Sequence, residues 1–228
     1  LALMCSGTHP FSSWHDQTVS PNPRYARLIQ EMQWMARRLQ IFGVHVHVGV
    51  RSPAKAVAIA NALAGYIPHL LALSASSPYW EGTDTGLASS RSKVFEGLPT
   101  AGLPAPIDSW DDFEQFMETL VSSQAISTVR EVWWDIRPHP DFGTVELRMC
   151  DGLASLDEVG ALAAMAQSLV TELVERIDSG EPLPDAPEWV VRENKWLAAR
   201  YGADSSFIVD GQGERRPAGE LIEELVDR

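Results

Sequence analysis

The sequence predicts an α+β fold in which helices cover one face of an antiparallel sheet. Residues 43 to 50 read Gly-Val-His-Val-His-Val-Gly-Val, and this alternation is typical of a strand. Residues 132–138 and 144–150 are two further strand-like runs, and the five residues between them include proline and glycine, as in an antiparallel hairpin. Segments with helical periodicity lie between and after these strands.

The composition is that of an ordinary globular protein, with 45% hydrophobic and 21% charged residues in a chain of 228. The net charge of −13, without any basic run, argues against a nucleic-acid partner. No apolar run approaches the roughly 20 residues that span a bilayer, so we expect no membrane partner. Cys5 and Cys150 form no CxxC pair, and we expect reduced thiols in a cytoplasmic protein, although the sequence leaves a disulfide open.

The N-terminal part is expected to hold one strand end and one helix. The chain does not begin with Met, and residues 1–5 resemble the end of a buried strand, so we expect a fragment of a longer protein. Asn22 followed by Pro23 predicts a helix start, with a capping side chain and a proline in the first turn. Gly43 is expected to end that helix.

A central helix is predicted to follow the histidine-containing strand. Ser52 and Pro53 mark its start, and residues 54–73 are apolar nearly all round, as in a buried helix. Pro68 is expected to kink or end it. Residues 74–106 have no periodicity, and a loop this long in a compact domain is usually functional or disordered. Its aromatic and charged residues favour a function.

Two capping boxes predict helix starts in the second half of the chain. Ser109 with Asp112 opens a short amphipathic helix, and Ser155 with Glu158 opens a long one that reaches residues 179–180.

A further helix is expected over roughly residues 187–201, ended by Gly202. A short strand at 206–209, a glycine-rich turn and a helix from Pro217 follow.

Each predicted strand has one apolar face and one polar face, because side chains two residues apart point the same way. If the three strands share a sheet, six polar side chains meet on one surface: His45, His47, Asp135, Arg137, Glu146 and Arg148. Each also has an ordinary explanation, such as hydrogen-bonded core histidines or a solvated pair worth under about 1 kcal/mol. Their coincidence on three strands favours a site.

The chemistry of this surface suits a divalent metal and an anion. A carboxylate and an imidazole can share a metal, while guanidinium groups neutralise a phosphoryl group or bind a carboxylate. The GxxxxGK[ST], HExxH and GxSxG motifs are absent, so an ATP site here would not be a P-loop. A cupin site is excluded because Arg51, Ser52 and Pro53 begin a helix where its glutamate is expected.

Several blocks, in order along the chain, resemble glutamate–cysteine ligase family 2, the bacterial carboxylate–amine ligases of the glutamine synthetase superfamily. The blocks are Thr8–Phe11, Gly43–Gly49, Leu73–Trp80, Gly82–Gly86, Ser90–Arg91, Leu98–Pro104, Asp135–Pro140, Gly143–Arg148 and Arg192–Trp196. They extend through nearly the whole chain.

The resemblance implies a curved antiparallel sheet like the catalytic domain of glutamine synthetase, with residues 1–228 forming part of one catalytic domain. It also implies a ligase that phosphorylates the γ-carboxylate of glutamate with ATP and Mg²⁺, after which cysteine or another amine displaces phosphate, as in glutathione-type thiol biosynthesis. Homo-oligomerisation is compatible with this. Alternatives are a ligase with another amine or acid, and a non-catalytic relative that binds nucleotide or metal.

The resemblance also assigns roles to residues. His45 and Glu146 correspond to metal ligands, and Arg148 to an arginine that faces the nucleotide phosphates. Arg91 and Arg137 are candidate catalytic charge partners of the acyl phosphate or the amino-acid carboxylate. The candidate substrate- or nucleotide-binding residues are His9, His47, Ser74, Asp84 and Thr85.

One departure from the family concerns the metal. Family members begin with a glutamate-rich strand that supplies further ligands, and this sequence has no such run. We therefore expect the chain to hold part of the metal site. Because histidine is an unusual ligand for Mg²⁺, Mn²⁺ is expected to bind at least as well.

Overall fold

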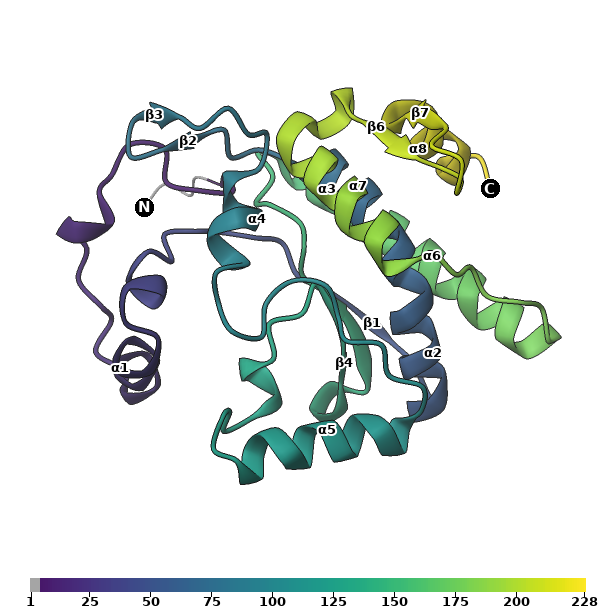
Figure 1. The fold of residues 1–228 in the computed structure, drawn as a ribbon, viewed down its shortest axis with the longest axis horizontal. Coiled ribbons are helices and arrows are strands. Elements are labelled where there is room, and N and C mark those ends of the chain that lie inside the picture. Colours follow the sequence, from purple (N-terminus) through teal and green to yellow (C-terminus); the bar gives the residue numbers. More distant parts are fainter. Residues whose placement is uncertain (1–4) are drawn as a thin grey trace.

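The computed structural model describes residues 5–228. The strand expected at residues 1–5 lies outside this range, except for Cys5, which is in irregular structure. The described chain is a mixed α and β structure with one three-stranded antiparallel sheet and two short hairpins (Figure 1). This agrees with the predicted α+β class.

The main sheet has the strand order β1–β5–β4, with both pairs antiparallel. Its strands are β1 (Val46–Gly49), β4 (Ile136–His139) and β5 (Thr144–Leu147). All three are shorter than predicted. Outside these strands, the neighbouring residues pair only at isolated positions, such as the bridge between Gly43 and Asp151.

The register of the sheet places apolar residues opposite apolar residues and polar residues opposite polar residues. Val46 and Ile136 both lie opposite Leu147, which places apolar side chains together. One position along, His47 and Arg137 both lie opposite Glu146. Because side chains alternate between faces, these two rows lie on opposite sides of the sheet. The predicted separation into an apolar and a polar face is confirmed.

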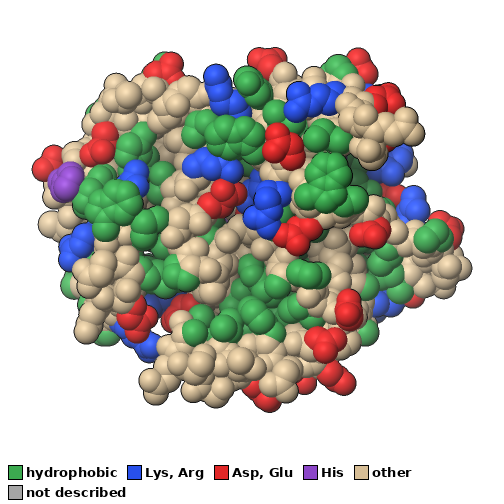
Figure 2. Space-filling view, viewed as in Figure 1, with side chains coloured by type: hydrophobic (Ala, Val, Ile, Leu, Met, Phe, Trp, Pro, Cys, Tyr) green, Lys and Arg blue, Asp and Glu red, His purple; other side chains and the backbone are tan. Residues whose placement is uncertain are grey.

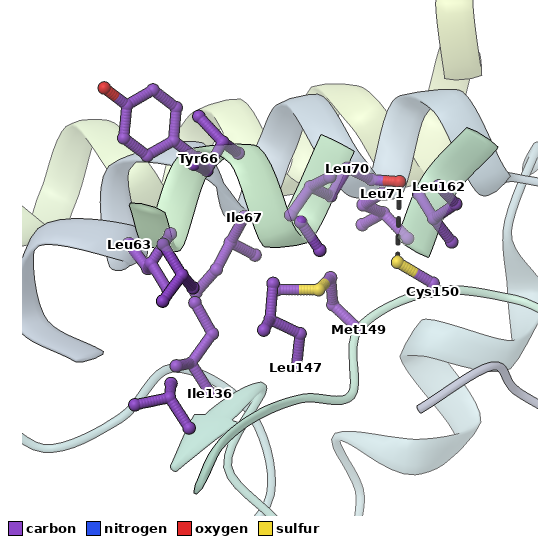
Figure 3. Packing of buried hydrophobic residues seen from close by; sticks show 14 of the residues in the cluster. Leu63, Tyr66, Ile67, Leu70, Leu71, Ile136, Leu147, Met149, Cys150 and Leu162 are labelled. Carbon is purple, nitrogen blue, oxygen red and sulfur yellow. Dashed lines mark hydrogen bonds between the residues drawn. The ribbon is translucent and has the colours of Figure 1, made fainter. Parts of the chain in front are cut away.

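A layer of helices packs against the apolar face. It consists of α2 (Pro53–Leu63), α3 (Ile67–Ser74) and α6 (Leu156–Ser179). Figure 3 shows Leu63, Ile67 and Leu70 facing Ile136, Leu147 and Met149, all at most 2% exposed. Each Å² of apolar surface that this contact removes from water stabilises the fold by roughly 25 cal/mol.

The apolar segment Pro53–Ser74 spans 22 residues as α2, a 3-10 turn and α3. In the described part of the chain it is long and apolar enough to cross a membrane, contrary to our expectation that no run approaches that length. However, 61% of its most apolar window is buried within the protein, as in a central core helix. Pro68 lies in the first turn of α3, so the predicted interruption is confirmed.

The other elements surround this centre. They are α1 (Pro23–Arg37), β2 (Tyr79–Trp80), β3 (Thr83–Asp84), α4 (Ser90–Phe95), α5 (Trp110–Ser122), α7 (Glu188–Tyr201), β6 (Ser206–Ile208), β7 (Arg215–Pro217) and α8 (Ala218–Val226). The predicted loop at 74–106 therefore contains a small hairpin and a helical turn, and β7 was not predicted.

The helix-capping predictions are largely confirmed. Asn22 and Ser52 cap α1 and α2, and the Ser155–Glu158 capping box is complete at the start of α6. At α5, Ser109 caps the helix as predicted, since its hydroxyl accepts from the Asp112 amide at 3.1 Å. The second half of the box differs, because the Asp112 carboxylate accepts from the Ser109 hydroxyl, at 2.6 Å, and not from the Ser109 amide.

The predicted end of the first helix at Gly43 is wrong. Helix α1 ends at Arg37 after a break at Gln33, whose φ of 48° is not helical. The chain then pairs through Ile41 with Thr8, which draws it out of the helix towards β1.

We expect Gly43→Ala to lower the free energy of unfolding by about 1–3 kcal/mol, as overpacking does. A Cβ atom at Gly43 would lie 2.8 Å from the Cys150 carbonyl oxygen and would overlap the Arg91 guanidinium. Gly49→Ala is the matched control, since nothing lies within 4 Å of its added carbon. Urea denaturation of both variants tests this, and equal stability would contradict the packing described.

Candidate functional site

The candidate site is built around Glu146, in the centre of β5. Its carboxylate is flanked by Arg137 on β4 and His47 on β1, directly opposite it in the register. Arg148 lies two residues further along the same face, and His45 lies immediately before β1. Five of the six side chains predicted to share a surface are thus brought together.

The Glu146 carboxylate is shared by two guanidinium groups. Arg137 Nε donates to Oε2 at 2.6 Å, and Arg148 Nη1 donates to Oε1 at 2.5 Å. All three side chains are buried, with Glu146 only 2% exposed. Burial acts to raise the pKa of Glu146, but contact with His45 and the charges of Arg148 and Arg137 outweigh it and hold this pKa well below its usual range. The group is therefore ionised at neutral pH.

The two arginines are held differently. Arg137 Nη1 donates to the backbone carbonyls of Val129 and Val132, the latter at 2.5 Å, so the main chain fixes its guanidinium. Within the described residues, the Arg148 side chain has polar contacts with Glu146 and His45 alone, and its buried Nε has no hydrogen-bond partner.

The two histidines form the open side of the site. His45 Nδ1 and His47 Nε2 each lie 3.4 Å from Glu146 Oε1, while 37% and 32% of their side-chain surfaces are exposed. Burial lowers the pKa of His45, and together with the nearby Arg148 charge it outweighs the contact with Glu146, which acts to raise this pKa, so the ring is neutral at pH 7. His47 Nδ1 is hydrogen-bonded to the Thr144 hydroxyl at 2.9 Å, which orients the ring.

Two atoms of this cluster fit as ligands of one divalent cation. Ligand atoms about 2.1 Å from one ion lie roughly 3.0–3.4 Å apart, and His45 Nδ1 and Glu146 Oε1 are 3.4 Å apart. The described residues include no group of three or more His, Cys, Asp and Glu side chains that could hold a metal. The fit is therefore to a partial site, and a cation held there would need further oxygen ligands, such as water or phosphate.

Arg91 binds the main chain next to the cluster, and among the described residues it has no hydrogen bond or ion pair with Glu146. Its guanidinium donates to the backbone carbonyls of Met149, at 3.0 Å, and Arg148, at 3.1 Å, and lies 3.7 Å from Asp151. Asp151 in turn accepts hydrogen bonds from Ser77 and Ser89. This network holds the main chain that follows β5, so Arg91 positions Arg148 through its backbone.

The four candidate binding residues outside the main sheet have hydrogen-bond partners away from the Glu146 cluster, including the Asp151 amide, which donates to Ser74. Ser74 is fully buried and donates to the Leu70 carbonyl. Asp84, the last residue of β3, is exposed and accepts from the Gly86 amide, and Thr85, which follows it, is half-buried. His9 Nδ1 accepts from the Ser12 amide. Among the described residues, none of the four has a hydrogen bond or ion pair with the cluster around Glu146.

Lys195 is a charged residue of this region for which the sequence predicts no role. It is 3% exposed on α7 and forms ion pairs with Asp135 and with Glu96, the latter at 2.7 Å. The backbone carbonyl of Asp135 accepts from the Arg148 amide at 2.7 Å, so this group adjoins the site. The sequence does contain a signal for this burial. Lys195 follows Val191 by four residues, a spacing that places both side chains on the same, buried side of α7.

The surface over this region is strongly charged. Figure 2 shows acidic and basic side chains gathered near the middle of one face, in the region of α4 and α7, with apolar side chains around them. Lys93 and Lys195 both form ion pairs with Glu96 there. Burial acts to raise the pKa of Glu96, but the two ammonium groups outweigh it, so its pKa is lowered.

His139 and Phe142 also border the site. The His139 ring is stacked on Phe142 with a centroid distance of 4.4 Å, and both lie beside His47. Gly143, with φ of 62°, makes the turn that places Phe142 there.

Comparison with known proteins gives a consistent result. The sequence model of glutamate–cysteine ligase family 2 matches residues 1–228. The chain is 63% identical over 227 residues to a protein of Frankia casuarinae named "Putative glutamate--cysteine ligase 2-1". It is 53% identical over 226 residues to a similarly named protein of Thermobifida fusca, and 49% over 228 residues to one of Mycobacterium ulcerans. These matches cover 99–100% of this chain but 57–59% of the relatives.

We expect Glu146→Gln to lower the free energy of unfolding by about 3–5 kcal/mol at pH 7, because two buried guanidiniums lose their counter-charge. The folded-state pKa of Glu146 lies below that of an unfolded glutamate, about 4.3, so its stabilisation is complete above that pH and is lost as pH falls below it. The difference between wild type and variant should therefore shrink below pH 4.3. Urea denaturation across pH measures this.

The matched control is Glu118→Gln on the exposed surface of α5, which should change stability by less than about 0.5 kcal/mol. A Glu146 variant as stable as this control would show that the ion cluster does not hold the sheet.

Proposed function

Since the chain belongs to glutamate–cysteine ligase family 2, we propose that it forms part of an ATP-dependent carboxylate–amine ligase that joins glutamate to cysteine or another amine. The proposal includes a glutamine synthetase-like catalytic sheet, to which β1, β4 and β5 contribute, and a cytoplasmic location. The observation that carries it is the ionised cluster around Glu146, on the histidine- and arginine-containing strands that correspond to the family's active site.

The charge of this cluster suits phosphoryl transfer. Two guanidiniums and one carboxylate leave one net positive charge on the polar face, next to neutral His45. Transfer of a phosphoryl group needs positioning and charge neutralisation more than covalent catalysis. The buried Nε of Arg148 has no hydrogen-bond partner, so a movement of this side chain towards a phosphate or carboxylate oxygen would give that donor an acceptor.

In the proposed reaction, a γ-carboxylate oxygen of glutamate attacks the terminal phosphorus of ATP and ADP leaves. The nitrogen of the amine then attacks the acyl carbon, phosphate leaves with the acyl–oxygen electron pair, and the amine loses a proton. Arg148 binds the phosphate oxygens throughout, and Arg137 holds Glu146 in place. His45 and Glu146 would hold Mg²⁺ or Mn²⁺, which would neutralise charge on the phosphates.

The experiment is to measure ADP release by the complete gene product with ATP, glutamate and Mg²⁺ or Mn²⁺, across a panel of amines that includes cysteine. We expect release that depends on both glutamate and an amine. His45→Ala and Glu146→Ala should each lower kcat/KM by about 100-fold or more, since both weaken charge neutralisation. Glu118→Gln should leave the rate unchanged.

Circular dichroism of each variant separates lost folding from lost chemistry. No glutamate-dependent ADP release with any amine would contradict the ligase proposal, whereas release with an amine other than cysteine would correct only the substrate. Wild-type activity of His45→Ala at limiting metal would show that this residue is not a ligand.

A further inference from the structure

The Arg148 guanidinium lies where a divalent cation bound by His45 and Glu146 would lie. Its Nη1 is 2.5 Å from Glu146 Oε1 and 3.3 Å from His45 Nδ1, so one nitrogen contacts both candidate ligand atoms. We propose that Arg148 competes with the metal for this pair, and that an oxyanion relieves the competition by drawing Arg148 away. The inference rests on the proposed function in one respect, that the oxyanion is a phosphate group of the nucleotide.

Charge makes simultaneous occupancy unfavourable. Arg137, Arg148 and Glu146 together carry one net positive charge, and a divalent cation would raise it to three within a buried cluster. Like charges a few ångströms apart in such surroundings repel strongly. The cation can therefore bind well only if one guanidinium moves.

The contacts identify Arg148 as the group that moves. Arg137 is tied to the backbone carbonyls of Val129 and Val132 as well as to Glu146. Arg148 has only side-chain partners among the described residues, and its buried Nε is without one. An unsatisfied buried donor is costly, and an oxyanion that accepts from it supplies the missing hydrogen bond.

This arrangement couples the two ligands. An oxyanion that engages Arg148 frees the His45–Glu146 pair for the cation, and the cation, by displacing Arg148, makes it available to the oxyanion. Because such coupling is reciprocal, each ligand must tighten the binding of the other. The metal alone is expected to bind weakly, which keeps the site from filling before a phosphate-bearing substrate arrives.

The test is titration of the chain with Mn²⁺, with free Mn²⁺ followed by electron paramagnetic resonance. Arg148→Met removes the competing charge and should tighten Mn²⁺ binding by about tenfold or more. Arg148→Lys keeps the charge and serves as the matched control, with an affinity within about threefold of wild type. His45→Ala placed in the Arg148→Met background should abolish the gain, which excludes binding elsewhere on this acidic chain.

A second measurement uses the wild-type chain, in case Arg148→Met does not fold. Sulfate binds guanidinium groups but chelates Mn²⁺ weakly, so replacing chloride by sulfate at constant ionic strength should tighten Mn²⁺ binding by about threefold or more. A folded Arg148→Met variant should show no such effect of sulfate.

Unchanged or weaker Mn²⁺ binding by Arg148→Met, or the lack of any sulfate effect on wild type, would overturn the inference. Neither readout depends on turnover. If Arg148→Met tightens Mn²⁺ binding but the protein shows no glutamate-dependent ADP release, the competition stands and the ligase proposal fails. If ADP is released but Arg148→Met does not tighten Mn²⁺ binding, only the proposed role of Arg148 is wrong.

Discussion

The interaction on which the rest of this structure depends is the pair of guanidinium groups that share the Glu146 carboxylate. A buried charge is costly unless it is paired and hydrogen-bonded, and Glu146 is held on one oxygen by Arg137 and on the other by Arg148. The strand register makes this possible, since Arg137 and His47 both lie opposite Glu146. The packing of α2, α3 and α6 against the other face keeps that register, because a slip by one residue would bury the charges in the apolar layer.

The polar face is supported by a second tier of buried charges. Lys195 on α7 pairs with Asp135 and Glu96, and Asp135 accepts from the backbone amide of Arg148. Arg91 on α4 binds the carbonyls of Met149 and Arg148. Segments distant in sequence thus converge on the residues after β5. Such paired charges contribute less to net stability than to fixing one arrangement. Here they leave His45 and His47 as the accessible part of the face, while Arg148 is buried.

Much of this arrangement was predictable from local patterns. Alternation at residues 43–50 and 144–150 predicts strands and shows which side chains share a face, and the capping residues predict most helix starts. Local patterns do not identify neighbours in space. The strand order, the alignment of Glu146 with His47, and the tie of Arg137 to the Val129 and Val132 carbonyls all come from tertiary contacts. The same limit explains why Lys195 received no role, and why the roles expected of Ser74, Asp84 and Thr85 remain predictions.

The central claim is that Glu146 is a buried carboxylate, ionised at neutral pH, whose charge organises both the sheet and the site. Its most direct test is the pH titration of the Glu146 side-chain carboxyl carbon, followed by nuclear magnetic resonance with Glu146→Gln to assign the signal. The account predicts that this signal stays at its ionised position through the pH range in which the exposed glutamates titrate, because the pKa is held far below theirs. A titration midpoint among those of the exposed glutamates would contradict it.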